Sequence, residues 1–151
     1  MSRKGSLFSS QKGMVVMEGL DSVKESYGRA CLHPNLIDRF YNIFLESHPD
    51  IKPMFKNTDF KKQHTLLKTG VIMLLAHLSG KSIWTENLDK IAESHSKKNL
   101  NIPPTLYPYW IDSLICAVKE NDEKWTPELE HNWRKILKVG VTYLTDRYET
   151  P

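Results

Sequence analysis

Apolar residues recur along the chain at the spacing of amphipathic helices. Between residues 34 and 47, four side chains follow the i, i+3, i+4, i+7 pattern of one helical face: Ile37, Phe40, Tyr41 and Phe44. Strand signals are scarce, because period-two alternation is rare and no Asn-Gly or Asp-Gly hairpin turn occurs. The pattern predicts an all-helical fold of six or seven helices, the main ones at about 15–31, 34–47, 58–79, 85–98, 105–120 and 126–147.

The expected helix ends carry residues that break or cap helices. Pro34 and Pro49 each follow a histidine and interrupt the pattern, and Pro34 fits the first turn of the second helix. Gly80 ends the third helix. The unequal helix lengths favour a globular α fold over a regular four-helix bundle. The side chains expected to cap helix starts are Asn57 or Thr58, Thr85 and Thr126.

The net charge of +3 over 151 residues is unevenly distributed. Residues 1–13 carry three basic side chains and no acidic one, which leaves 18 Lys and Arg against 18 Asp and Glu in the rest of the chain. We therefore expect a disordered basic extension at 1–14 and one folded domain at 15–151. Because the expected domain has no net charge, the sequence gives little reason to expect a nucleic-acid partner.

Several classes of protein are excluded by what the chain lacks. The longest apolar run, residues 71–76, is far too short to cross a bilayer, and no apolar stretch near the start resembles a secretory signal. Cys31 and Cys116 form no CxxC pair, and this pattern favours a reducing compartment. No GxG sequence is available for a dinucleotide-binding loop. We expect a cytoplasmic protein without a membrane partner.

His95 is the histidine that stands out by its position. It extends the apolar stripe of Leu88, Ile91 and Ala92 by one helical turn, at the end of the fourth predicted helix. The simpler interpretation is a half-buried histidine with a hydrogen bond. The more specific interpretation is that His95 is a single axial ligand to the iron of a flat cofactor. Neutral imidazole binds iron, and a single protein ligand leaves the opposite coordination position open to a gas.

Three stretches in order carry a family resemblance: FYNIFLESHPDIKPMF at 40–55, LDKIAESH at 88–95, and LYPYW at 106–110 with WRKILKVGVTYL at 133–144. Together they resemble the globin family, in particular bacterial single-domain haemoglobins, over about residues 17–147. The resemblance implies six to eight helices packed around a pocket for haem b, iron protoporphyrin IX.

The resemblance also implies roles for individual residues. His95 matches the proximal iron ligand, and Phe55 matches the phenylalanine that contacts haem in the corner after the second helix. Tyr41, fourteen residues before Phe55, and Gln63, thirty-two residues before His95, match distal residues that donate hydrogen bonds to a bound gas. Leu67 matches the apolar residue beside the gas. The other expected haem contacts are Phe60, Val71, Leu88, Ile91 and Tyr107.

Alternatives remain open on the distal side. A shift of one residue in the third helix would put Lys62 with Leu66, or His64 with Lys68, in the positions given to Gln63 and Leu67. Tyr41 could instead be a core tyrosine, and Gln63 a solvated residue. His64 could lie at the pocket rim or bind the iron directly when no gas is present.

The resemblance implies a globin that reversibly binds O2, and also NO and CO, at a pentacoordinate or weakly hexacoordinate iron. Oxygen transport, storage or sensing would follow, or NO detoxification with an external reductase; weak peroxidase activity is also compatible. The alternative is a haem-free globin-fold sensor or interaction module in stress signalling. Either a monomer or a homodimer fits the sequence.

Overall fold

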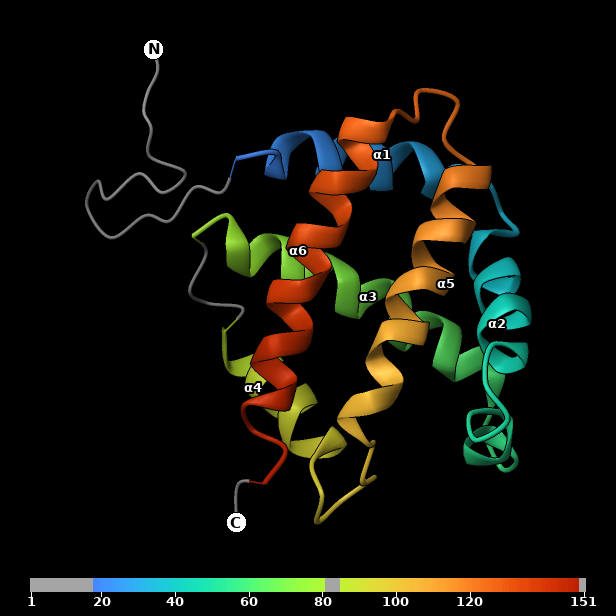
Figure 1. Cartoon of the computed structure of the whole chain (residues 1–151), viewed down its shortest axis with the longest axis vertical. Helices are drawn as coiled ribbons and strands as arrows, with labels where there is room; N and C mark the ends of the chain where they lie inside the picture. The colour runs from blue at the N-terminus through green and yellow to red at the C-terminus, as the bar shows by residue number, and fades with distance from the viewer. Residues whose placement is uncertain (1–17, 81–84, 150–151) are drawn as a thin grey trace.

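The computed structural model describes residues 18–80 and 85–149. Within these ranges the regular elements are helices only, which confirms the predicted all-helical class (Figure 1). The predicted basic extension, 1–14, lies outside the described residues, and the domain boundary at residue 15 stays a prediction. The six α-helices are α1 (Leu20–Cys31), α2 (Leu36–Glu46), α3 (Phe60–Leu78), α4 (Thr85–His95), α5 (Tyr107–Glu120) and α6 (Pro127–Thr145), and two short 3-10 turns are η2 (Lys52–Phe55) and η4 (Pro104–Leu106).

The start of α3 corrects the predicted cap. Asp59, and not Asn57 or Thr58, precedes the helix, and its carboxylate accepts hydrogen bonds from the backbone N–H groups of Lys61 and Lys62 at 3.1 and 3.3 Å. Those N–H groups have no partner within the helix. A negative charge at this position also interacts favourably with the positive end of the helix dipole.

The end of α4 also differs from the prediction. Thr85 is the first described residue of the helix, as predicted, and its hydroxyl lies 2.9 Å from the His77 ring. The helix ends at His95 and not near residue 98, because the chain folds back at once: the N–H groups of Leu100 and Asn101 donate to the carbonyls of Ser94 and Ser96. Asn101 has a positive φ of 55°, a conformation that asparagine tolerates better than most residues.

The last helix begins as predicted. The Thr126 hydroxyl accepts a hydrogen bond of 3.0 Å from the Leu129 N–H, and Pro127 occupies the first turn. Figure 1 shows α5 and α6 together in front, with α1 and α3 crossing behind them. A Cβ atom on Gly140 of α6 would lie 2.7 Å from the Leu74 side chain of α3, so glycine allows these two helices to approach closely.

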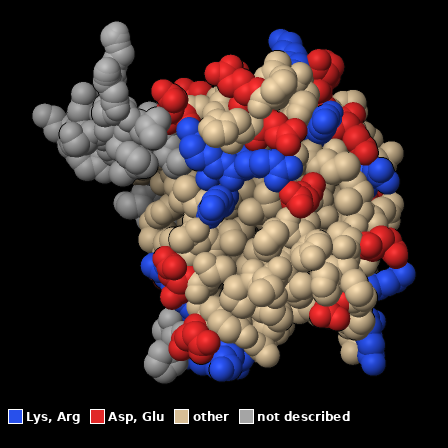
Figure 2. Space-filling model, viewed as in Figure 1, with Lys and Arg blue, Asp and Glu red and all other residues tan. Residues whose placement is uncertain are grey.

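The core lies where these layers meet, and its largest fully buried side chains include Trp133, Phe40 and Leu114. On the face shown in Figure 2, acidic and basic residues are interspersed around an uncharged centre and form no continuous basic stripe. No helix in the described ranges is both long enough and apolar enough to cross a membrane.

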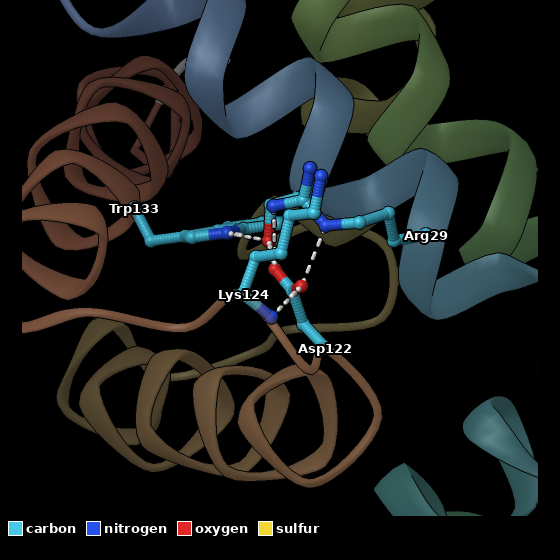
Figure 3. A network of polar contacts seen from close by, with 5 residues as sticks. Arg29, Asp122, Lys124 and Trp133 are labelled. Carbon is cyan, nitrogen blue, oxygen red and sulfur yellow. Dashed lines mark hydrogen bonds and ion pairs between the residues drawn. The ribbon is translucent and has the colours of Figure 1, made fainter.

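A buried polar network joins α1 to the corner between α5 and α6 (Figure 3). The Asp122 carboxylate accepts hydrogen bonds from the Ser26 hydroxyl at 2.6 Å, from the Arg29 guanidinium at 2.6 and 3.0 Å, and from the Lys124 N–H at 3.0 Å. The Trp133 indole donates in turn to Ser26 at 2.9 Å. This network fixes the end of the molecule where α1, α5 and α6 meet.

Candidate functional site

Tyr41 lies at the centre of an aromatic cluster between α2 and α3. This residue is only 4% exposed. The rings of Phe55 and Phe60 approach it edge-on, with centroids 6.0 and 5.5 Å away. The His64 ring stacks nearly parallel to it at 5.3 Å. The second helix, the corner after it and the start of α3 thus bring three of the predicted site residues together.

The hydroxyl of Tyr41 is a hydrogen-bond donor at neutral pH. Burial raises the pKa of Tyr41 to about 12, and the neighbouring Gln63 side chain acts in the opposite direction. The two side chains that were expected to face a bound gas therefore lie together. A protonated phenol and an amide offer N–H and O–H groups to any acceptor beside them.

The residues named in the three possible registers of α3 differ in exposure. Gln63 and Leu67 are partly buried on the side that faces the protein. Lys62 and Lys68 point to solvent, as does Leu66, which is 55% exposed. Each alternative register requires one or two of these exposed residues to line the site, so the arrangement favours Gln63 with Leu67.

His95 lies on the other side of the site, at the end of α4. Its Nδ1 is 2.8 Å from the Ile91 carbonyl oxygen and 3.0 Å from the Ser94 hydroxyl. A carbonyl oxygen can only accept, so Nδ1 carries the proton and Nε2 keeps its lone pair. None of the described residues forms a hydrogen bond with Nε2.

The protonation state of His95 suits metal binding. Burial lowers the pKa of His95, and the hydrogen bond to the Ile91 carbonyl opposes this shift. The imidazole is therefore neutral at physiological pH, as a metal ligand must be. Within the described ranges no three His, Cys, Asp or Glu side chains lie close enough to hold a metal ion.

The remaining predicted contacts are apolar or aromatic and come from several elements. Leu67 and Ile91 are partly buried against the core, and Val71 and Leu88 are buried within it. A Cβ atom on Gly70 would lie 4.0 Å from the Ile91 side chain, which brings α3 close to α4 at this point. Tyr107, the first residue of α5, is buried. Its pKa is raised to about 12, mainly by burial and to a smaller extent by the nearby Tyr148.

Sequence reasoning missed two residues that act on predicted site residues. Ser94 contacts the His95 ring. Its position directly before the histidine is the sequence feature that could have indicated this contact. Asp38 lies 3.3 Å from Nδ1 of His64. Its spacing of three residues from Tyr41 placed both on one face of α2, but the partner on α3 could be found only from the packing of the two helices.

Comparisons with known proteins agree with this architecture. A family model described as Globin matches residues 38–144. A crystal structure of a Pseudomonas aeruginosa protein, described as structurally highly homologous to a human hemoglobin, superposes with a TM-score of 0.84 at 34% identity. That match covers 88% of this chain and all of the other. The predicted globin fold is therefore confirmed.

Curated relatives match over a shorter part of their length. Flavohemoproteins from Oceanobacillus iheyensis and Bacillus subtilis are 31% and 28% identical over 103 and 104 residues. These alignments cover about two thirds of this chain but only 25% and 26% of the two relatives. The family match over residues 38–144 and the structural match over 88% of the chain lead to one conclusion: this chain belongs to the globin family.

Proposed function

We propose that this globin binds haem b between α3 and α4, with Nε2 of His95 as the axial ligand. Membership of the family supports the cofactor, and the relatives named flavohemoproteins support it further. When bound, haem supplies an iron that reversibly binds small gases such as O2, NO and CO. The observation that carries the proposal is the His95 ring, which is held through Nδ1 and whose Nε2 has no hydrogen-bond partner among residues 18–80 and 85–149.

The residues around His95 have a defined part in this proposal. The Ile91 carbonyl and the Ser94 hydroxyl hold the imidazole in one tautomer and one orientation. Accepting a hydrogen bond from Nδ1–H also makes Nε2 a better electron donor. The apolar and aromatic contacts would hold the haem and exclude water around it; they are Phe55, Phe60, Leu67, Val71, Leu88, Ile91 and Tyr107.

Tyr41 and Gln63 are proposed as the donors on the opposite side. A gas that takes partial negative charge accepts hydrogen bonds from a phenol and an amide. Each hydrogen bond to a charged group contributes about 1.5–3 kcal/mol, which corresponds to roughly ten- to a hundredfold in affinity. The pair therefore favours tight binding and slow release of O2, for storage, sensing or transport.

NO detoxification is the second candidate, and the alignment with flavohemoproteins favours it. This chain corresponds to only about a quarter of their length. Sustained turnover needs electrons to return the iron to the ferrous state, so this function requires an external reductase. Rapid NO consumption by the O2-bound protein, sustained only when a flavin reductase is added, would support it.

The test of haem binding is the absorption spectrum in the ferric, ferrous and CO-bound states. The wild-type protein reconstituted with haem should show a strong Soret band that shifts with CO. His95→Ala should lose the axial nitrogen ligand, and added imidazole should restore its spectrum. His131→Ala is the control, because His131 is an exposed residue of α6. A wild-type protein without a Soret band would instead favour the haem-free module.

A further inference from the structure

A histidine stacks on Tyr41 and a carboxylate contacts that histidine, and neither has a part in the function proposed above. Nδ1 of His64 is 3.3 Å from the Asp38 carboxylate. The His64 ring stacks on the Tyr41 ring with an interplanar angle of 8° and a centroid distance of 5.3 Å. The pair spans two helices, because Asp38 belongs to α2 and His64 to α3.

The stack sets the plane of the Tyr41 ring. In the described part of the chain, the other aromatic neighbours of this ring meet it edge-on, at 67° for Phe55, 75° for Phe60 and 77° for Phe40. Only His64 lies parallel to it. A rotation of Tyr41 about its Cβ–Cγ bond would break the parallel contact, so the face of His64 resists that rotation.

Asp38 in turn holds the His64 ring. It lies three residues before Tyr41, so both side chains leave the same face of α2. The exposed fraction falls from 61% for the Asp38 side chain to 31% for that of His64 and 4% for Tyr41. The contacts thus run from a solvent-exposed carboxylate, through a half-buried imidazole, to a buried phenol.

We propose that Asp38 and His64 are positioning residues for the Tyr41 hydroxyl. Asp38 fixes the orientation of the His64 ring, the ring fixes the plane of Tyr41, and the hydroxyl stays directed at Gln63 and the gas beside it. The inference rests on the proposed function in one respect, since the Tyr41 hydroxyl is proposed there as a donor to the gas. The contacts themselves are independent of haem.

The first experiment needs no haem. NMR of the haem-free full chain follows the Tyr41 ring protons, which are assigned by their loss in Tyr41→Phe. His64→Leu should move them downfield, because they lose the ring-current shielding of the stacked imidazole. His64→Phe should keep most of that shielding, and Asp38→Asn should lose part of it. Unchanged Tyr41 signals in both His64→Leu and Asp38→Asn would overturn the proposal.

The chain contains a matched control for the Asp38 substitution. Nδ1 of His48 lies 3.9 Å from the Asp50 carboxylate, and the His48 ring contacts Tyr109 at 4.9 Å. Asp50→Asn therefore makes the same chemical change beside a histidine that touches a different tyrosine. It should leave the Tyr41 signals unchanged. A shift of those signals equal to that in Asp38→Asn would point to a general charge effect and overturn the proposal.

The second experiment measures O2 dissociation from the haem-loaded protein. His64→Leu should speed O2 release about two- to tenfold, the effect expected when one aromatic contact is lost. Asp38→Asn should act in the same direction but less strongly. It should have no further effect when combined with His64→Leu or Tyr41→Phe, because the ring or the hydroxyl through which it acts is then absent.

Two results of this second experiment would overturn the proposal. One is an equal effect of Asp38→Asn with and without His64, which would mean that its charge acts directly. The other is a six-coordinate ferrous spectrum that His64→Phe converts to five-coordinate, which would make His64 an iron ligand. A protein that binds no haem would refute the proposed function, and the NMR measurement would still decide the positioning role.

Discussion

The buried polar groups at the two ends of this molecule differ in how many of their possible hydrogen bonds they make within the protein. At the Asp122 end, each carboxylate oxygen accepts two hydrogen bonds from the protein, and the Asp122 side chain is fully shielded from solvent. At the other end, His95 engages one ring nitrogen and leaves the second unpaired among the described residues. The buried Tyr41 hydroxyl meets an amide side chain, that of Gln63.

This difference separates stability from ligand binding within one fold. Groups whose hydrogen bonds are all made within the protein can stabilise it and have little capacity left for a ligand. Groups that keep an unpaired lone pair or proton contribute less to stability and can bind something else. We therefore expect substitutions at the Asp122 end to change unfolding, and those around His95 and Tyr41 to change gas binding.

The largest expected effect is on stability, from Asp122→Ala. The substitution removes the shared acceptor of Ser26, Arg29 and the Lys124 N–H. Loss of one partner of a buried ion pair should lower the free energy of unfolding by about 3 kcal/mol. Urea denaturation measures this. Glu120→Gln breaks the exposed pair with Arg39 and should change stability little. Equal losses in the two variants would contradict the contrast between the two ends.

Tyr41→Phe is the corresponding test at the other end. Loss of the hydroxyl should cost about 1.5–3 kcal/mol of gas binding, so O2 should dissociate roughly ten- to a hundredfold faster. Stopped-flow measurement of O2 release gives the rate. Urea denaturation should show a much smaller effect than for Asp122→Ala, since the ring and its contacts remain. An unchanged O2 dissociation rate would refute Tyr41 as the donor.

Helical periodicity and spacing predicted how some residues of the candidate site lie relative to one another. Tyr41 and Phe55 lie in contact, and Gln63 and Leu67 fall on the inward side of α3, because these positions follow from the register of two regular helices. Helix ends were harder. Asn57, Thr58 and Asp59 are all good caps, and the choice depends on the preceding turn, where the Thr58 N–H bonds to the Phe55 carbonyl.

Contacts between distant elements could not be predicted in this way. Lys97 and Lys98 are compatible with a longer α4, but the Lys97 N–H bonds to the Tyr148 carbonyl, so a tertiary contact takes the amide that a longer helix would use. The Asp122 network joins residues 93 and 96 positions apart. The Asp38–His64 pair needs α2 packed against α3. Periodicity shows which face of a helix is buried, and packing decides what that face meets.

Acid should weaken the Asp122 end only at low pH. Burial tends to raise the pKa of Asp122, but hydrogen bonds from Arg29, Ser26 and the Lys124 N–H outweigh it and lower the pKa to about 2, against 3.8 when unfolded. The stabilisation is therefore complete above pH 4 and is lost as the pH falls toward 2. At 1.36 kcal/mol per pKa unit, it amounts to about 2 kcal/mol. Urea denaturation of wild type and Asp122→Asn across this range should show a difference that shrinks with acid, and a constant difference would count against the assignment.

The smallest expected losses of stability come from removing two helix caps, one at the Tyr41 end of the molecule and one at the Asp122 end. Asp59→Ala and Thr126→Ala each remove a side chain that accepts backbone hydrogen bonds at a helix start. Each should cost about 1 kcal/mol. The two substitutions should differ in which amides they affect, because α6 packs the fully buried Trp133 into the core while Lys61 and Lys62 in the first turn of α3 are exposed.

Hydrogen exchange separates the two outcomes. Asp59→Ala should speed exchange only at the first amides of α3, those of Lys61 and Lys62, which its carboxylate binds in the wild type. Thr126→Ala should speed exchange along the slowest amides of the core, since α6 opens only with the whole protein. If Asp59→Ala also accelerated the core amides, the two ends would unfold as one unit. The Tyr41 side would then be as tightly coupled to global stability as the Asp122 network.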